Sequence, residues 1–319
     1  MSTQFNYLVA GSEQITGANV LARINKNITV GNNPAGISSD GTNVWVANQA
    51  GGTVSKINCS TGLIVDTITI IGAVNLSYIS SDGVSVWVSD SSFANKVYQI
   101  NCSTVSAVVA TIIVGNFPYG ISSDGTNVWV CNTGGGSVSK INCLSGSVVD
   151  TITGFSDPIS ISSDGINAWV ANNGIANNIS QINCSTGLIV NTISLATNIY
   201  APVSISSDGT NVWVANDGGN AVSQISCLTS LLVATIVGFN NPYGISSDGT
   251  NVWVANTSGN TVSQINIPNV LTIGGNTVLD GSLSVNGSVY TSGNKGFTGV
   301  IVIGAISLNV INGLIINYQ

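Results

Sequence analysis

Residues 38–46, Ser-Ser-Asp-Gly-Thr-Asn-Val-Trp-Val, decide the fold, because this stretch returns five more times with few changes. Its aspartate recurs at spacings of 42, 42, 40, 44 and 40 residues, at Asp40, Asp82, Asp124, Asp164, Asp208 and Asp248. A period of about 40 residues is typical of a supersecondary unit that cannot bury its apolar surface alone and must stack on copies of itself. The sequence therefore predicts an array of similar units.

The copy at residues 35–72 shows what one unit contains. Its β-branched and aromatic runs predict four short strands, at 36–39, 43–48, 53–58 and 63–70. Glycine-containing turns separate them, as at Asp40-Gly41, where glycine supplies the positive φ of a tight turn. Four antiparallel strands in each unit, with no helical period, predict an all-β chain whose units are the blades of a β-propeller.

The number of blades depends on the first residues of the chain. Residues 6–11, 18–25 and 28–31 resemble the second, third and a shortened fourth strand, so they predict a blade without its first strand. Residues 271–279 are expected to supply that strand, since a closed ring leaves no sheet edge exposed. The interpretation is a seven-bladed propeller over residues 1–272 and a β-rich segment over 273–319. Six blades with an N-terminal extension is the alternative.

Two strings carry a resemblance to known proteins. Residues 57–68, Ile-Asn-Cys-Ser-Thr-Gly-Leu-Ile-Val-Asp-Thr-Ile, and residues 43–48, Asn-Val-Trp-Val-Ala-Asn, resemble YVTN, NHL and streptogramin-lyase-like propeller repeats. The resemblance covers about residues 6–267. It implies the propeller fold, which serves adhesins, lectins, S-layer modules and a few enzymes. The lyase of this group depends on histidine, and this chain contains none.

Composition excludes several classes of function. Charged residues make up 6% of the chain and the net charge is −7, with six lysines and arginines in all. A chain without a basic stripe is not expected to bind nucleic acid. The absence of histidine removes the usual acid–base group at neutral pH and the commonest metal ligand. We therefore expect no cofactor, no metal and no catalytic residues, and we expect no membrane span.

The segment after residue 272 is expected to make contacts between molecules. Its short strands, separated by glycine and asparagine, resemble the tails of phage and other viral fibre proteins. Strands of this size bury too little surface to stand alone, and uncharged β-branched strands suit addition to another sheet edge. The predicted assembly residues are Phe297, Val300, Ile301, Val302, Ile303, Leu314, Ile315 and Ile316.

Residues that repeat in every blade are interpreted as scaffold. Each repeated aspartate suits a tight turn, and each repeated tryptophan suits packing between blades. The six cysteines are expected to be free thiols, because equivalent positions on neighbouring blades lie too far apart for a disulfide. Aromatic residues near loops are better candidates for ligand binding, namely Phe93, Phe117, Tyr119, Tyr200, Phe239 and Tyr243.

These observations predict a non-enzymatic structural or adhesion protein on a virion surface or otherwise extracellular. The propeller would be displayed on a viral appendage or fibre and would assemble with itself through the C-terminal strands. A host-surface glycan or protein is the expected further partner. Two alternatives remain open, a subunit of a microbial extracellular filament or S-layer and a glycan-binding propeller lectin.

Overall fold

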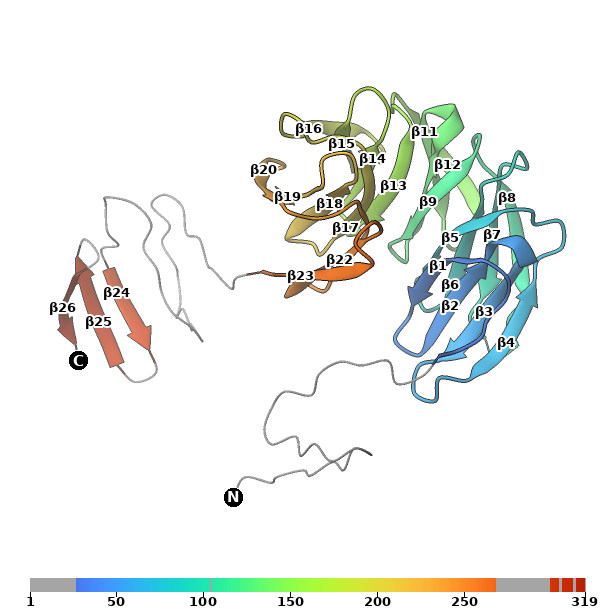
Figure 1. The fold of residues 1–319 in the computed structure, drawn as a ribbon, viewed down its shortest axis with the longest axis horizontal. Helices are drawn as coiled ribbons and strands as arrows, with labels where there is room; N and C mark the ends of the chain where they lie inside the picture. The colour runs from blue at the N-terminus through green and yellow to red at the C-terminus, as the bar shows by residue number, and fades with distance from the viewer. Residues whose placement is uncertain (1–26, 104, 268–298, 304–305, 312–313, 319) are drawn as a thin grey trace, which may run out of the picture.

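The computed structural model describes residues 27–103, 105–267, 299–303, 306–311 and 314–318. From residue 34 to residue 266 the chain forms six antiparallel sheets in sequence order, each with its strands side by side (Figure 1). Blades 1 to 3 comprise β1 (Pro34–Ser39), β2 (Asn43–Asn48), β3 (Thr53–Asn58) and β4 (Ile64–Thr69); β5 (Leu76–Ser81), β6 (Ser85–Asp90), β7 (Lys96–Asn101) and β8 (Val108–Ile113); β9 (Pro118–Ser123), β10 (Asn127–Asn132), β11 (Ser137–Asn142) and β12 (Ser147–Thr153).

Blades 4 to 6 follow the same plan. They comprise β13 (Pro158–Ser163), β14 (Asn167–Asn172), β15 (Asn178–Asn183) and β16 (Ile189–Ser194); β17 (Pro202–Ser207), β18 (Asn211–Asn216), β19 (Ala221–Ser226) and β20 (Leu232–Val237); β21 (Pro242–Ser247), β22 (Asn251–Asn256) and β23 (Thr261–Asn266). Two 3-10 turns, η1 (Gln49–Gly51) and η2 (Thr133–Gly135), connect second and third strands.

Turn chemistry sets the ends of the strands. Gly41 has a φ of 83° and joins β1 to β2 directly, as predicted. Five of the six first strands begin at a proline and have an irregular register within the next three residues, as between Pro34 and Gly36. Proline is suited to the first residue of a strand, because its missing N–H is not needed by the ladder.

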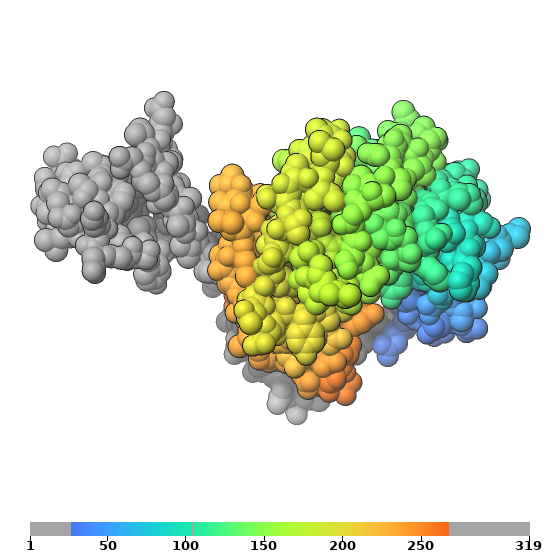
Figure 2. Space-filling view, turned by 90° about the horizontal axis from the view of Figure 1, so that it is seen from above, coloured from blue at the N-terminus to red at the C-terminus, as the bar shows by residue number. Residues whose placement is uncertain are grey.

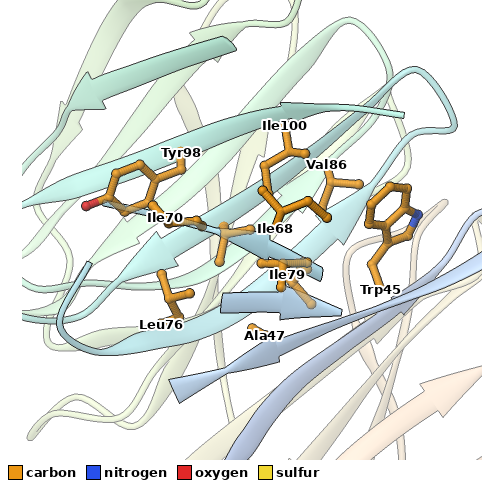
Figure 3. Close-up of a cluster of buried hydrophobic side chains, with 11 residues drawn as sticks. Trp45, Ala47, Ile68, Ile70, Leu76, Ile79, Val86, Tyr98 and Ile100 are labelled. Atoms are coloured by element: carbon orange, nitrogen blue, oxygen red, sulfur yellow. The ribbon is translucent and has the colours of Figure 1, made fainter. Parts of the chain in front are cut away.

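The core lies between blades rather than inside any one of them. In the cluster of Figure 3, Trp45, Ala47 and Ile68 of blade 1 lie among Leu76 and other apolar side chains of blade 2. In Figure 2 the blades follow one another as adjacent bands of colour, so each blade packs on the one before and the one after. This is the packing expected of a repeat that buries its faces against its own copies.

The structure confirms an all-β propeller of antiparallel, mostly four-stranded blades, but the prediction of seven blades is not confirmed. The described residues form six, and blade 6 has three strands. The six sheets form an open arc, with the opening between β22–β23 and β1–β2 (Figure 1). Residues 6–11, 18–25 and 271–279, which were expected to make three strands of the further blade, lie outside the described residues. Residues 28–31, expected as its shortened fourth strand, form no strand but lead into β1 as an irregular link.

Beyond the propeller, three strands form a sheet of their own. They are β24 (Gly299–Ile303), β25 (Ile306–Ile311) and β26 (Leu314–Tyr318), with β25 in the middle. Both outer strands of this sheet pair on one side only among the described residues. No helix within the described ranges has the length and hydropathy needed to cross a membrane.

Candidate ligand-binding groove

The propeller has two rims with different chemistry. The Asp rim carries the Asp-Gly turns between first and second strands, and the loop rim carries the links between blades and the connections from second to third strands. At the Asp rim the Asp40 carboxylate accepts hydrogen bonds from the N–H groups of Thr42 and Asn43 and, at 2.8 Å, from the indole of Trp45. Burial raises the pKa of Asp40, but these hydrogen bonds outweigh it and lower the pKa below 3.8.

Two other carboxylates of the Asp rim, those of Asp82 and Asp124, also join neighbouring blades. Ser123 donates its hydroxyl to Asp82 at 2.9 Å, and Ser163 donates to Asp124 at 3.1 Å. A hollow of about 330 Å³ lies here, lined by Asp82, Ser123, Asp124, Gly125, Ser163 and Asp164. The Oδ1 atoms of Asp82, Asp124 and Asp164 accept from N–H groups of their own turns, and the Oδ2 atom of each accepts from the tryptophan indole of its own blade. The repeated aspartates therefore hold the turns and the tryptophan rings in place.

The repeated tryptophans are scaffold as well. Trp45, Trp87, Trp129, Trp169 and Trp213 are at most 2% exposed, so no sugar can stack on them. Lys56 and Lys140 lie over two of these rings, with Nζ 4.9 Å from the centroid of Trp45 and 5.2 Å from that of Trp129. The sixth, Trp253, differs and is 44% exposed.

All six cysteines are free thiols. Five of them occupy one position at the Asp rim, and each of these five has its Sγ within 4.0 Å of a serine hydroxyl of the same blade, as between Cys184 and Ser163. Burial raises the pKa of Cys143, Cys184 and Cys227 to about 11, so these thiols stay protonated and unreactive near neutral pH.

A groove of about 450 Å³ opens at the loop rim between blades 2, 3 and 4. Its lining combines an apolar floor with hydroxyl and carboxylate groups, from Ser91, Phe117, Tyr119, Thr133, Gly134, Asp157 and Ile159. Binding sites for small ligands are typically concave, mostly apolar and provided with a few polar groups that fix orientation. This groove has those properties, and it contains two of the aromatic residues predicted from the sequence.

Phe117 is held in an unusual conformation. It is the residue before the proline of β9, and its φ is 51°. The equivalent residues Asn33, Asp157, Ala201 and Asn241 have φ values from 49° to 53°, so the link between blades imposes this conformation. Asparagine tolerates it well, but a bulky side chain is a real outlier there. A phenylalanine at this position therefore raises the conformational energy of the link between blades 2 and 3.

Two neighbours fix the ring of Phe117. Its centroid lies 4.7 Å from that of Phe93, which is 86% exposed, in an edge-on arrangement. On another side a Cβ added to Gly134 would lie 2.5 Å from the Phe117 ring, so only glycine leaves room for it. The structure thus brings together Phe93, Phe117 and Tyr119 of the predicted ligand residues.

Tyr119 joins the groove to an aromatic residue of the neighbouring blade. Its ring centroid lies 4.8 Å from that of Tyr78 in β5 of blade 2, with the two rings tilted. Burial, followed by the nearby Tyr243, raises the pKa of Tyr119 to about 12. The phenol therefore stays protonated at physiological pH and can donate as well as accept.

The other predicted ligand residues lie elsewhere. Tyr200 lies on the loop before blade 5, against Gly218, and Phe239 packs on the core between blades 5 and 6 beside Trp213. Sequence reasoning missed Ser91, Thr133, Asp157 and Ile159. Asp157 holds the same repeat position as Phe117, directly before a proline, so aligning the blades at that proline would have found it.

Of the predicted assembly residues, the structure places Val300, Ile301, Val302 and Ile303 in β24 and places Leu314, Ile315 and Ile316 in β26. These are the two outer strands of the C-terminal sheet. Phe297 lies outside the described residues.

Comparison with known proteins gives structural neighbours only. No family profile matches the sequence, and no curated protein matches it. A streptogramin B lyase structure is similar with a TM-score of 0.62 and 20% identity, over 76% of this chain and 85% of that one. A catalytically inactive virginiamycin B lyase from Staphylococcus aureus with quinupristin gives 0.64 and 21%, over 74% and 82%. The computationally designed Ika8 protein gives 0.61 and 12%, over 73% and 71%.

These neighbours establish the fold and correct one expectation. At such identities the likeness shows the propeller architecture alone. The expectation of a non-enzymatic protein does not stand, because the similar structures include lyases, which are enzymes. The expected resemblance to streptogramin-lyase-like propellers is confirmed at the level of fold, whereas these neighbours do not show the expected resemblance to viral fibre proteins.

Proposed function

We propose that the protein is a recognition propeller that binds a carbohydrate in the groove at the loop rim. It would be displayed on a virion surface or another extracellular particle through residues 273–319. The observation that supports this most is Phe117, an aromatic ring placed where the backbone prefers asparagine, beside Tyr119 and the exposed carboxylate of Asp157. Strained residues of this kind cluster at active sites and ligand-binding sites.

The chemistry of the groove suits a sugar. A pyranose ring has an apolar C–H face and hydroxyl groups around its edge. The rings of Phe117 and Tyr119 offer flat apolar surface, and Asp157 offers a charged acceptor for hydroxyl groups. The hydroxyl of Thr133 already donates to the carbonyl of Pro158, so it presents lone pairs to a ligand.

A lyase-type activity is the second candidate, supported by the similar lyase structures. The variant of the Staphylococcus aureus lyase with histidine replaced by alanine is described as catalytically inactive. This chain has no histidine, so acid–base work would fall to Asp157 or Tyr119 instead. Incubating the protein with quinupristin and following the product by mass spectrometry tests this candidate. No product above the buffer control counts against it.

A glycan array followed by calorimetry tests the first proposal. Phe117→Ala and Asp157→Asn are each expected to weaken binding at least tenfold. Tyr200→Ala is the matched control, because Tyr200 is an exposed aromatic residue of the same rim outside the groove. Binding that responds equally to Phe117→Ala and Tyr200→Ala, or an array without any bound glycan, contradicts the proposed ligand.

The oligomeric state tests the role of the C-terminal segment. The outer strands β24 and β26 are suited to strand addition by a second molecule. Analytical ultracentrifugation is expected to show assembly of the full chain and its loss in Val300→Lys and Ile315→Lys. Assembly that survives both variants and removal of residues 268–319 shows that another surface is responsible.

A further inference from the structure

Trp253 stands apart from the five tryptophans that share its repeat position. It is 44% exposed, whereas the other five are between 0% and 2% exposed. The indole of each of the five donates to the aspartate of its own turn, at 2.8 to 3.4 Å. Within the described residues the indole of Trp253 has no such hydrogen bond. One copy of a buried scaffold residue is thus open to solvent.

The surroundings of Trp253 are open as well. Ala255 is exposed and Val262 is 65% exposed. In blade 5 the equivalent residues Ala215 and Val222 are fully buried. We call Trp253, Ala255 and Val262 the end face of blade 6. The end face carries the residue types that are buried between blades elsewhere, but no described blade packs against it. A large exposed apolar surface of this kind is typical of a contact site.

The other interfaces show what covers such a face. Trp213 and Val222 of blade 5 pack against Val252 and Val254, two alternate residues of β22, with Ile265 of β23 beside them. The surface that covers such a face therefore consists of a second strand with apolar residues two positions apart and a third strand whose last residue but one is isoleucine.

Residues 6–25 have the sequence pattern of such a covering surface. Residues 6–10, Asn-Tyr-Leu-Val-Ala, repeat the pattern of 251–255, Asn-Val-Trp-Val-Ala, so Tyr7 and Val9 correspond to Val252 and Val254. Ile24 precedes Asn25 just as Ile265 precedes Asn266. This segment leads directly into residues 27–33 and β1, which lie on the other side of the opening in the arc (Figure 1). Its position along the chain therefore keeps it beside the opening.

We propose that residues 6–25 of the same chain dock on the end face of blade 6, with Tyr7 and Val9 against Trp253. The contact repeats the one that Val252 and Val254 make with Trp213. Docking of this kind requires two strands from residues 6–25. It does not require residues 271–279 to supply a first strand. The exposed Ile37 of blade 1, on the opposite side of the opening, marks where the far side of the docked segment would lie.

Quenching of tryptophan fluorescence by iodide, at constant ionic strength, tests this docking in the full chain. Wild-type protein is expected to have no readily quenched tryptophan. The double variant Tyr7→Asp with Val9→Asp is expected to expose about one of the six, and adding Trp253→Phe removes that quenched fraction. Ser12→Asp with Thr16→Asp is the control, because both lie between the predicted strands and are expected to leave Trp253 protected.

Several outcomes overturn the proposal. A quenched fraction in the wild-type protein that Trp253→Phe removes shows an uncovered end face, and this result does not depend on whether the double variant folds. Protection of Trp253 that disappears on dilution, together with a change from dimer to monomer, assigns the face to a second copy. Protection unchanged in a folded Tyr7→Asp, Val9→Asp variant assigns it to some other part of the chain.

Discussion

Ser247 of blade 6 donates its hydroxyl to the Oδ2 atom of Asp208 of blade 5 at 2.9 Å. That oxygen also accepts the indole N–H of Trp213 at 3.0 Å, while Oδ1 caps the turn through Thr210 and Asn211. One side chain thus closes a turn, orients a buried ring and joins two blades.

Asp208→Asn is expected to destabilise the protein by about 2 kcal/mol. The amide oxygen can still cap the turn, but the amide nitrogen in the place of Oδ2 cannot accept hydrogen bonds from the Trp213 indole and the Ser247 hydroxyl. Asp248→Asn is the matched control, since the Asp248 carboxylate caps its turn and has no tryptophan or serine partner among the described residues. Urea denaturation measures both variants. Equal losses would show that the contact between blades contributes nothing beyond the turn.

Phe117→Asn separates ligand binding from stability. Asparagine suits the φ of 51°, which offsets the loss of ring contacts, so the free energy of unfolding is expected to stay within about 1 kcal/mol of wild type. Carbohydrate binding is expected to fall at least tenfold. Thermal denaturation and calorimetry measure the two quantities. A strongly destabilised variant would instead identify Phe117 as a packing residue.

Lys56 is buried, with its Nζ bonded to the carbonyls of Cys102 and Ser103 and to the hydroxyl of Ser106. Lys56→Ala is expected to cost about 3 kcal/mol, because it leaves these acceptors unpaired and opens a gap over Trp45. Lys56→Gln is expected to cost less, since Gln224 holds the same position in blade 5. Urea denaturation compares them, and equal costs would rule out the hydrogen bonds as the cause.

The thiols of three cysteines at the Asp rim, which are buried or half-buried, predict alkaline sensitivity. Folding raises the pKa of Cys143, Cys184 and Cys227 from 9.0 to about 11. Their contribution to stability is therefore complete below pH 9 and is lost as the pH rises toward 11, because the unfolded chain releases these protons first. The melting temperature of the triple Cys→Ser variant is expected to fall less than that of the wild-type protein as the pH rises over this range. A parallel decline in both proteins would assign the effect to other groups.

Much of the fold could be predicted because each blade is specified locally. The strands 43–48 and 53–58 were predicted with the observed bounds, since glycine-containing turns flank them on both sides. The first strand begins at Pro34, two residues before its predicted start, because proline is more typical of a link than of a strand. The number of blades depends on contacts between distant parts of the chain, which periodicity does not specify.

The groove was harder to predict. Phe117 and Tyr119 could be identified because they break the repeat, but their association with Phe93 and Asp157 depends on how three blades meet. The positive φ of Phe117 follows from the geometry of the link between blades, and a phenylalanine in the sequence does not by itself indicate a positive φ. Lys56 was unpredictable for a similar reason, since its acceptors lie in the next blade.

The outermost strands have a consequence for the behaviour of the protein in solution. Val65, Val149, Val190 and Val233 are all at least 50% exposed on β4, β12, β16 and β20, and charged residues make up only 6% of the chain. Coulomb repulsion therefore contributes little to keeping molecules apart, and hydration of serine, threonine and asparagine side chains must do so instead. Osmotic second virial coefficients should then change little with sodium chloride and turn negative when excluded solutes such as polyethylene glycol withdraw water.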